Sequence, residues 1–153
     1  MDDFYVITQL IVVSIAATSA MTLFSYAVSA SFRELYKEPV LLNLVMSKIQ
    51  SKPATEFKTV PGWVLHYIIG FLFVLAYHFI WIHDILPISA LAALLLGAAS
   101  GIIGIISWVF IFKMSHHEPP IDFKGYYIQL FAAHVIFAIT ATLLYYLSLT
   151  ILI

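Results

Sequence analysis

Cysteine is absent from this chain of 153 residues, and charged residues make up only 10% of it. Without cysteine there is no disulfide, no thiolate metal ligand and no cysteine nucleophile. The few Asp, Glu, Lys and Arg residues are confined to short segments, so that four long stretches contain none of them. These stretches are residues 4–32, 59–83, 85–112 and 125–153.

Each charge-free stretch is longer than the about 20 residues that an apolar helix needs to cross a bilayer. The hydrophobic fraction of 63% is far above that of a soluble domain. The sequence therefore predicts an all-α membrane protein, in which residues 1–153 form one transmembrane domain built as a bundle of four transmembrane helices. The predicted spans are about 5–31, 61–82, 87–113 and 122–150.

The positive charges predict the orientation. All seven Lys and Arg residues lie in two segments, 33–58 and 113–124, and short loops rich in these residues stay on the cytoplasmic side. We therefore expect a multi-pass protein of the plasma membrane (the bacterial inner membrane), surrounded by the lipid bilayer. Both termini and the 82–86 connection are expected outside.

The first basic segment contains a predicted short helix at about 39–50. Pro39 suits a first helical position, because its missing N–H would have no partner there. Apolar residues such as Leu41, Leu42 and Val45 alternate with Asn43 and Lys48. This pattern predicts an amphipathic helix lying on the cytoplasmic leaflet.

Small residues at four-residue spacing, Gly97, Ser100, Gly101 and Gly104, run along the third stretch. Such spacing lets helix backbones approach closely. The favoured interpretation is tight packing inside one subunit. The alternative is that the face of Gly97, Gly101 and Gly104 binds a second copy or a larger membrane complex.

Polar side chains inside a membrane are costly, so they usually face the protein interior and indicate function. Two histidines and two tyrosines are predicted in the cytoplasmic half of the bundle, around one cavity. We expect a carboxylate to fold over this cavity and a His-Glu pair to lie at its rim. The histidines are His66 and His134, and the tyrosines are Tyr26 and Tyr127. The carboxylate is that of Glu38, and the pair at the rim is His117 and Glu118.

This set suits several ligands. His66, His134, His117 and Glu118 are candidate metal ligands, and two facing histidines suit a haem. A proton relay is another alternative, as is plain packing of hydrogen-bonded histidines. No His-Glu-x-x-His motif, nucleophile elbow or phosphate-binding glycine loop is present. No catalytic residue is therefore predicted, and without a basic stripe nucleic-acid binding is not expected.

Several motifs carry a resemblance. They are Ala20-Met21-Thr22, Glu38-Pro39 before the amphipathic segment, Pro61-Gly62-Trp63-Val64-Leu65-His66 and the glycine-rich third stretch. Over roughly its first three quarters, the chain resembles small uncharacterised bacterial four-helix integral inner-membrane proteins. The resemblance implies four spans and draws attention to Trp63 and His66, but it implies no activity.

Three functions are consistent with the sequence. The favoured one is a membrane protein that binds a metal, a haem or a small ligand through histidines in the cytoplasmic half. The others are a non-catalytic accessory or scaffold subunit of a larger membrane complex, and a homo-oligomeric transporter or pore. An enzyme is less favoured.

Overall fold

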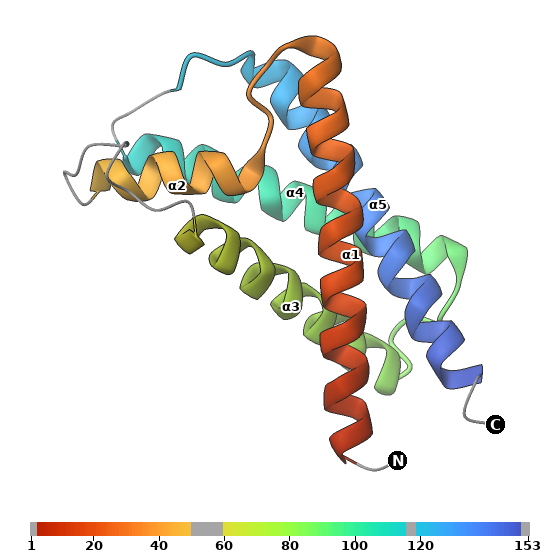
Figure 1. Ribbon diagram of the computed structural model, residues 1–153. Coiled ribbons are helices and arrows are strands. Elements are labelled where there is room, and N and C mark those ends of the chain that lie inside the picture. The colour runs from red at the N-terminus through yellow and green to blue at the C-terminus, as the bar shows by residue number, and fades with distance from the viewer. Residues whose placement is uncertain (1–2, 50–59, 116–118, 151–153) are drawn as a thin grey trace.

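The computed structural model describes residues 3–49, 60–115 and 119–150. In these ranges the regular elements are helices and there is no strand (Figure 1). The helices are α1 (Asp3–Phe32), α2 (Glu38–Ile49), α3 (Val60–Ile82), α4 (Ala90–Met114) and α5 (Phe123–Thr150). All except α2 are long and apolar enough to cross a membrane. The predicted fold, four membrane helices with a short helix between the first two, is confirmed.

The predicted span boundaries agree closely with the helices except at the start of the third span. That helix was expected to begin at Pro87, but α4 begins at Ala90. Ser89 has an extended backbone conformation, and its side-chain oxygen accepts a hydrogen bond at 3.2 Å from the N–H of Ala92. Ser89 is therefore the N-cap, and the capping hydroxyl decides where the helix starts.

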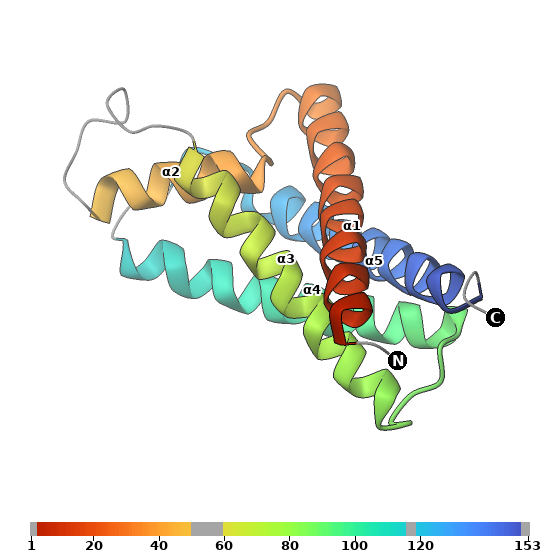
Figure 2. The ribbon, with the colours of Figure 1, turned by 60° about the horizontal axis from the view of Figure 1, so that its bottom comes forward.

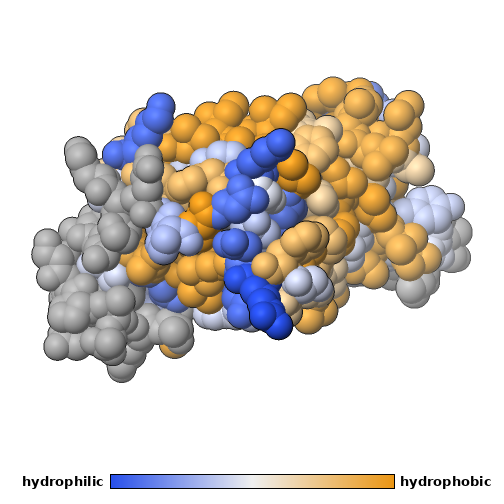
Figure 3. All heavy atoms as spheres, turned by 90° about the horizontal axis from the view of Figure 1, so that it is seen from above, coloured by the Kyte–Doolittle hydropathy of each residue, from blue (hydrophilic) through white to orange (hydrophobic). Residues whose placement is uncertain are grey.

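The ends of the helices fall into two groups. The start of α1, the end of α5 and the connection from α3 to α4 lie at one end of the molecule (Figures 1 and 2). Seen from above, hydrophilic side chains gather where α1 ends and α5 begins, with hydrophobic surface on either side (Figure 3). This grouping agrees with the one predicted from Lys and Arg, and which end faces the cytoplasm stays a prediction.

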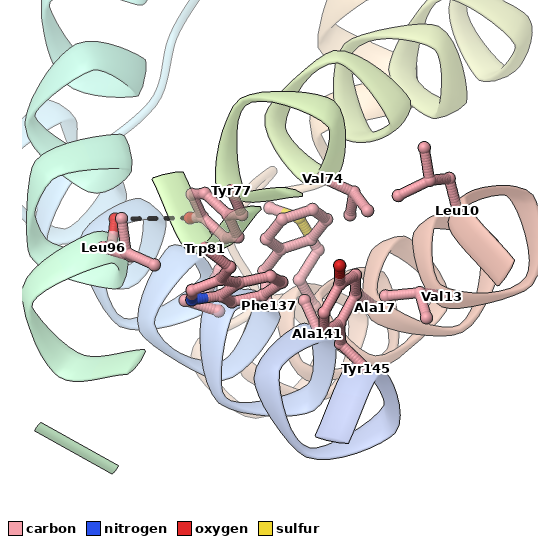
Figure 4. Packing of buried hydrophobic residues seen from close by; sticks show 13 residues of the cluster. Leu10, Val13, Ala17, Val74, Tyr77, Trp81, Leu96, Phe137, Ala141 and Tyr145 are labelled. Carbon is pink, nitrogen blue, oxygen red and sulfur yellow. Dashed lines mark hydrogen bonds between the residues drawn. The ribbon is translucent and has the colours of Figure 1, made fainter. Parts of the chain in front are cut away.

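The core lies where α1, α3 and α5 cross (Figure 4). Ala17 of α1 and Ala141 of α5 are fully buried, and such small residues let the two helices approach closely. Tyr77 of α3 reaches toward α4, where its hydroxyl donates to the carbonyl of Leu96 at 3.3 Å and lies 2.9 Å from the hydroxyl oxygen of Ser100. The polar tip of this buried ring is therefore satisfied.

The α4 glycines pack against α5 of the same chain. A Cβ atom on Gly97 would lie 2.7 Å from Cα of Val135, and one on Gly101 would lie 2.9 Å from the ring of Phe131. The interpretation of tight packing inside one subunit is confirmed. Binding a second copy or a larger complex through this face would require α5 to move away.

Helix α2 is buried in the protein more deeply than an interfacial helix would be. Leu41, Leu42 and Val45 are buried in a cluster that includes Trp108 and Phe112 of α4. The amphipathic pattern was expected to face lipid, but an apolar helix face is equally well covered by other helices. This face therefore belongs to the core of the protein.

A side chain of α2 also fixes the start of α3. The Asn43 side-chain oxygen accepts a hydrogen bond at 2.8 Å from the backbone N–H of Gly62. The first turn of a helix has N–H groups without partners in the helix itself. Asn43 therefore acts as a cap supplied by a different helix.

Replacing Asn43 by alanine should destabilise the protein by about 1–3 kcal/mol, because the buried N–H of Gly62 loses its acceptor. Thermal and chemical unfolding in a mild detergent would measure this. Ser31→Ala is the control, since the Ser31 hydroxyl is exposed and bonds only within its own helix. Equal stability of Asn43→Ala and Ser31→Ala would contradict the capping role.

Candidate functional site

A cavity of about 320 Å³ lies inside the bundle and is lined by residues from all five helices. Most of its wall is apolar, from side chains such as Met21, Phe73 and Phe137. Among the polar side chains of the wall are one carboxyl group, two imidazoles and one hydroxyl. These belong to Glu38, His66, His134 and Ser107.

His66 is buried, and its hydrogen bond defines its tautomer. Nε2 of His66 lies 2.9 Å from the Thr22 hydroxyl oxygen, and that hydroxyl donates to the carbonyl of Thr18 at 2.7 Å. A hydroxyl has one hydrogen, so the Thr22 oxygen must accept from Nε2–H of His66. In the neutral ring, Nδ1 of His66 then carries a lone pair.

His134 has the opposite tautomer. Its Nδ1 lies 2.8 Å from the carbonyl oxygen of Leu130, and because a carbonyl can only accept, Nδ1 carries the hydrogen. In the neutral ring, Nε2 carries the lone pair. The ring meets Phe73 edge-on at 5.7 Å between centroids. A Cβ atom on Gly104 would lie 3.0 Å from Nε2, so the glycine makes room for this ring.

Glu38, the first residue of α2, is only 2% exposed. Its Oε1 accepts from the Ser25 hydroxyl at 2.9 Å and from Nε2 of Gln129 at 3.2 Å. Its Oε2 has no hydrogen-bond partner in the part of the chain that the structure describes. Burial raises the pKa of the Glu38 carboxyl from 4.5 to about 7, although these hydrogen bonds oppose the shift. The carboxyl is therefore partly protonated at neutral pH.

The structure places His66, His134 and Glu38 at one cavity, as expected for these three residues, but Tyr26 lies elsewhere. The Tyr26 ring packs against Trp63 at 6.0 Å between centroids. Nζ of Lys37 lies 4.8 Å from the centre of the Tyr26 ring, within the range of a cation–π interaction. The expectation that Tyr26 shares this cavity is therefore wrong, because its side chain points to a different side of α1.

Tyr127 also lies away from the cavity wall. Its ring packs against Phe123 at 6.1 Å and against Tyr126 at 5.7 Å. The predicted rim residues His117 and Glu118 lie outside the described residues. Their part in a site stays a prediction.

Among residues 3–49, 60–115 and 119–150, no group of three or more His, Asp or Glu side chains is arranged to hold a metal ion. A metal bound by His66 and His134 would thus need His117 and Glu118, which the structure does not describe. A haem would have to fit in about 320 Å³, which is near the lower end of ligand-pocket volumes. The cavity better suits a molecule smaller than a haem.

Sequence reasoning missed the polar side chains that support the site. Thr22 and Ser25 are one helical turn apart on α1, and they bond to His66 and Glu38 respectively. Gln129 of α5 is buried and lies within hydrogen-bond distance of both Ser25 and Glu38. The signal was present, because a glutamine in a charge-free stretch needs a partner inside the membrane.

The fold is that of a multi-pass α-helical membrane protein with four membrane-crossing helices. No protein-family model, curated protein or solved structure matches the chain. The resemblance to small inner-membrane proteins is thus supported only in its four apolar helices.

Proposed function

We propose that this protein binds a small, mainly apolar molecule within the membrane, in the cavity lined by Glu38, His66 and His134. The observation that carries the proposal is the set of hydrogen-bond acceptors on an apolar wall. Oε2 of Glu38 has no partner among the described residues, and each histidine keeps one lone pair. Buried polar groups are almost always hydrogen-bonded. A few polar groups converging in an apolar cavity are typical of a ligand site.

The position of the cavity supports entry from the bilayer. Its wall includes Ile69 of α3 and Ser107 of α4, which are both exposed. Helices α3 and α4 are not among the closely packed pairs of described helices. Because both helices cross the membrane, lipid covers the surface between them. A hydrophobic molecule can therefore reach the cavity without passing through water.

The contacts inside the chain favour this function over a scaffold role. That alternative was based on the glycines of α4 and the apolar face of α2. Gly97 and Gly101 are covered by α5, and Leu41 is fully buried. Both surfaces are thus already occupied.

Replacing His66 or His134 by leucine tests the proposal, because leucine fills similar space but accepts no hydrogen bond. Each variant should retain a bound molecule roughly tenfold more weakly than the wild type, the effect of losing one buried hydrogen bond. Native mass spectrometry of the purified protein would detect an organic ligand. Metal analysis and an absorption spectrum would detect a metal or a haem.

His83→Leu is the matched control, since His83 is exposed at the end of α3 and bonds to the carbonyl of Phe79. It should retain the ligand as the wild type does. The proposal is wrong if the wild type carries neither ligand, metal nor chromophore while both cavity variants are at least as stable as it is. Removing a histidine from an unused apolar cavity would have that effect.

A further inference from the structure

Building on the proposed binding site, we infer that its ligand is a hydrophobic organic ammonium ion, whose N–H groups bind the Glu38 carboxylate and the histidine lone pairs. The inference depends on three features of the cavity. They are the excess of hydrogen-bond acceptors, an unpaired buried carboxyl group and an aromatic wall.

Acceptors predominate on the cavity wall. Oε2 of Glu38 has no hydrogen-bond partner among the described residues. The tautomers leave one lone pair on Nδ1 of His66 and one on Nε2 of His134. The Ser107 hydroxyl donates its hydrogen to the carbonyl of Ile103 at 2.8 Å, which leaves it as a further acceptor. Apart from Glu38, the two histidines and Ser107, the described wall has one side chain with a hydrogen-bond donor, the indole N–H of Trp108. A complementary ligand must therefore be mainly a donor, and a primary ammonium offers three N–H groups.

The charge of the site points the same way. Glu38 is the one acidic residue among the described residues of the wall, and none of these described residues is Lys or Arg. Its neighbour Lys37 lies over the ring of Tyr26, and no described residue forms a salt bridge with Glu38. An ionised carboxylate is costly to bury without a positive partner. A bound cation supplies that partner.

The remaining wall suits an organic cation. Phe73, Trp108 and Phe137 line the cavity, and aromatic faces attract ammonium groups as well as apolar carbon. A metal ion is less suitable, because the described residues offer no cluster of three His, Asp or Glu ligands. The ligand is therefore amphipathic, with an ammonium head at Glu38 and an apolar body among the rings.

Binding such a cation exchanges it for a proton. When the carboxyl of Glu38 is protonated, its O–H bond breaks, the proton passes to water, and the ammonium pairs with the carboxylate. Burial raises the pKa of Glu38 to about 7. As the pH rises toward that value, the affinity for the ammonium should increase by up to roughly tenfold per pH unit, and above that value the affinity should level off. The titratable side chains around Glu38 are Tyr26 on α1, His66 on α3, and Tyr126 and His134 on α5.

Two probes that differ mainly in charge test the inference. We would measure binding of 2-phenylethylammonium and of neutral 2-phenylethanol by calorimetry at pH 8. The protein would be the full chain in nanodiscs of zwitterionic lipid, with empty nanodiscs as the blank. The ammonium should bind roughly ten- to a hundredfold more tightly than the alcohol, as expected for a hydrogen bond between charged groups.

Glu38→Gln keeps the shape of the side chain and removes its charge, so it should abolish the preference for the ammonium. Equal binding of both probes to the wild type, unchanged in Glu38→Gln, would overturn the ammonium assignment and leave the binding site standing. Binding of neither probe above the blank would count against both proposals. An ammonium preference that persists in Glu38→Gln would also overturn the assignment, because the cation would then be bound elsewhere.

Discussion

Gly97→Leu is expected to lower the free energy of unfolding by at least about 3 kcal/mol, the upper range for overfilling a packed interior. Even a Cβ atom at this position would lie 2.7 Å from Cα of Val135 and 3.3 Å from the carbonyl oxygen of His134. Both are backbone atoms of α5, so no side-chain rotation can relieve the contact. The two helices would have to separate along their whole contact.

Ala99→Leu is the matched control, because Ala99 lies two residues further along α4 and is exposed. It adds a similar side chain toward the lipid and should leave stability nearly unchanged. Thermal unfolding in a mild detergent, followed by circular dichroism, would compare the two variants. If Gly97→Leu unfolds at the same temperature as Ala99→Leu, the contact between α4 and α5 is not as close as described.

Glu38→Gln is expected to remove a pH dependence of stability that the wild type shows between about pH 4.5 and pH 7. Burial raises the pKa of Glu38 from 4.5 to about 7 in the folded protein, so the folded state holds its proton more tightly than the unfolded state. Stability is then greatest below pH 4.5, falls as the pH rises toward 7, and levels off above it. A pKa difference of this size corresponds to about 3 kcal/mol.

Unfolding in non-ionic detergent from pH 4 to pH 8 would test this. At pH 8 the glutamine variant should be the more stable protein by up to that amount, because its amide is neutral and can still bond to Ser25 and Gln129. Glu34→Gln, in the connection between α1 and α2, is the control and should keep the slope of the wild type. A slope that survives in Glu38→Gln would assign it to another group.

The four membrane helices could be predicted from the sequence, because bilayer thickness sets their length and charged residues mark their ends. The surroundings of α2 could not. Leu41, Leu42 and Val45 form an apolar face, and lipid and protein cover such a face equally well. The choice depends on Trp108 and Phe112, which lie far away in the sequence.

The site could also be predicted only in part from the sequence. His66 and His134 were singled out by their depth, and they do share a cavity. Tyr26 has a suitable depth as well, but depth does not specify how a helix is rotated about its axis. On α1, Met21 faces the cavity and Ser25 bonds to Glu38, while the next residue, Tyr26, packs on Trp63. The rotation is set by contacts between helices, which periodicity alone does not reveal in an apolar span.

The burial of α2 has a consequence for how the protein is assembled. Chains are made and fold from the N-terminus onward, so α2 is made before the helices that supply Trp108 and Gln129. Until α4 and α5 enter the membrane, the apolar face of α2 has only α1 and α3 to cover it, and Glu38 lacks the amide of Gln129. The binding cavity therefore closes last, and a chain that stops before α5 would leave the Glu38 carboxyl without that partner.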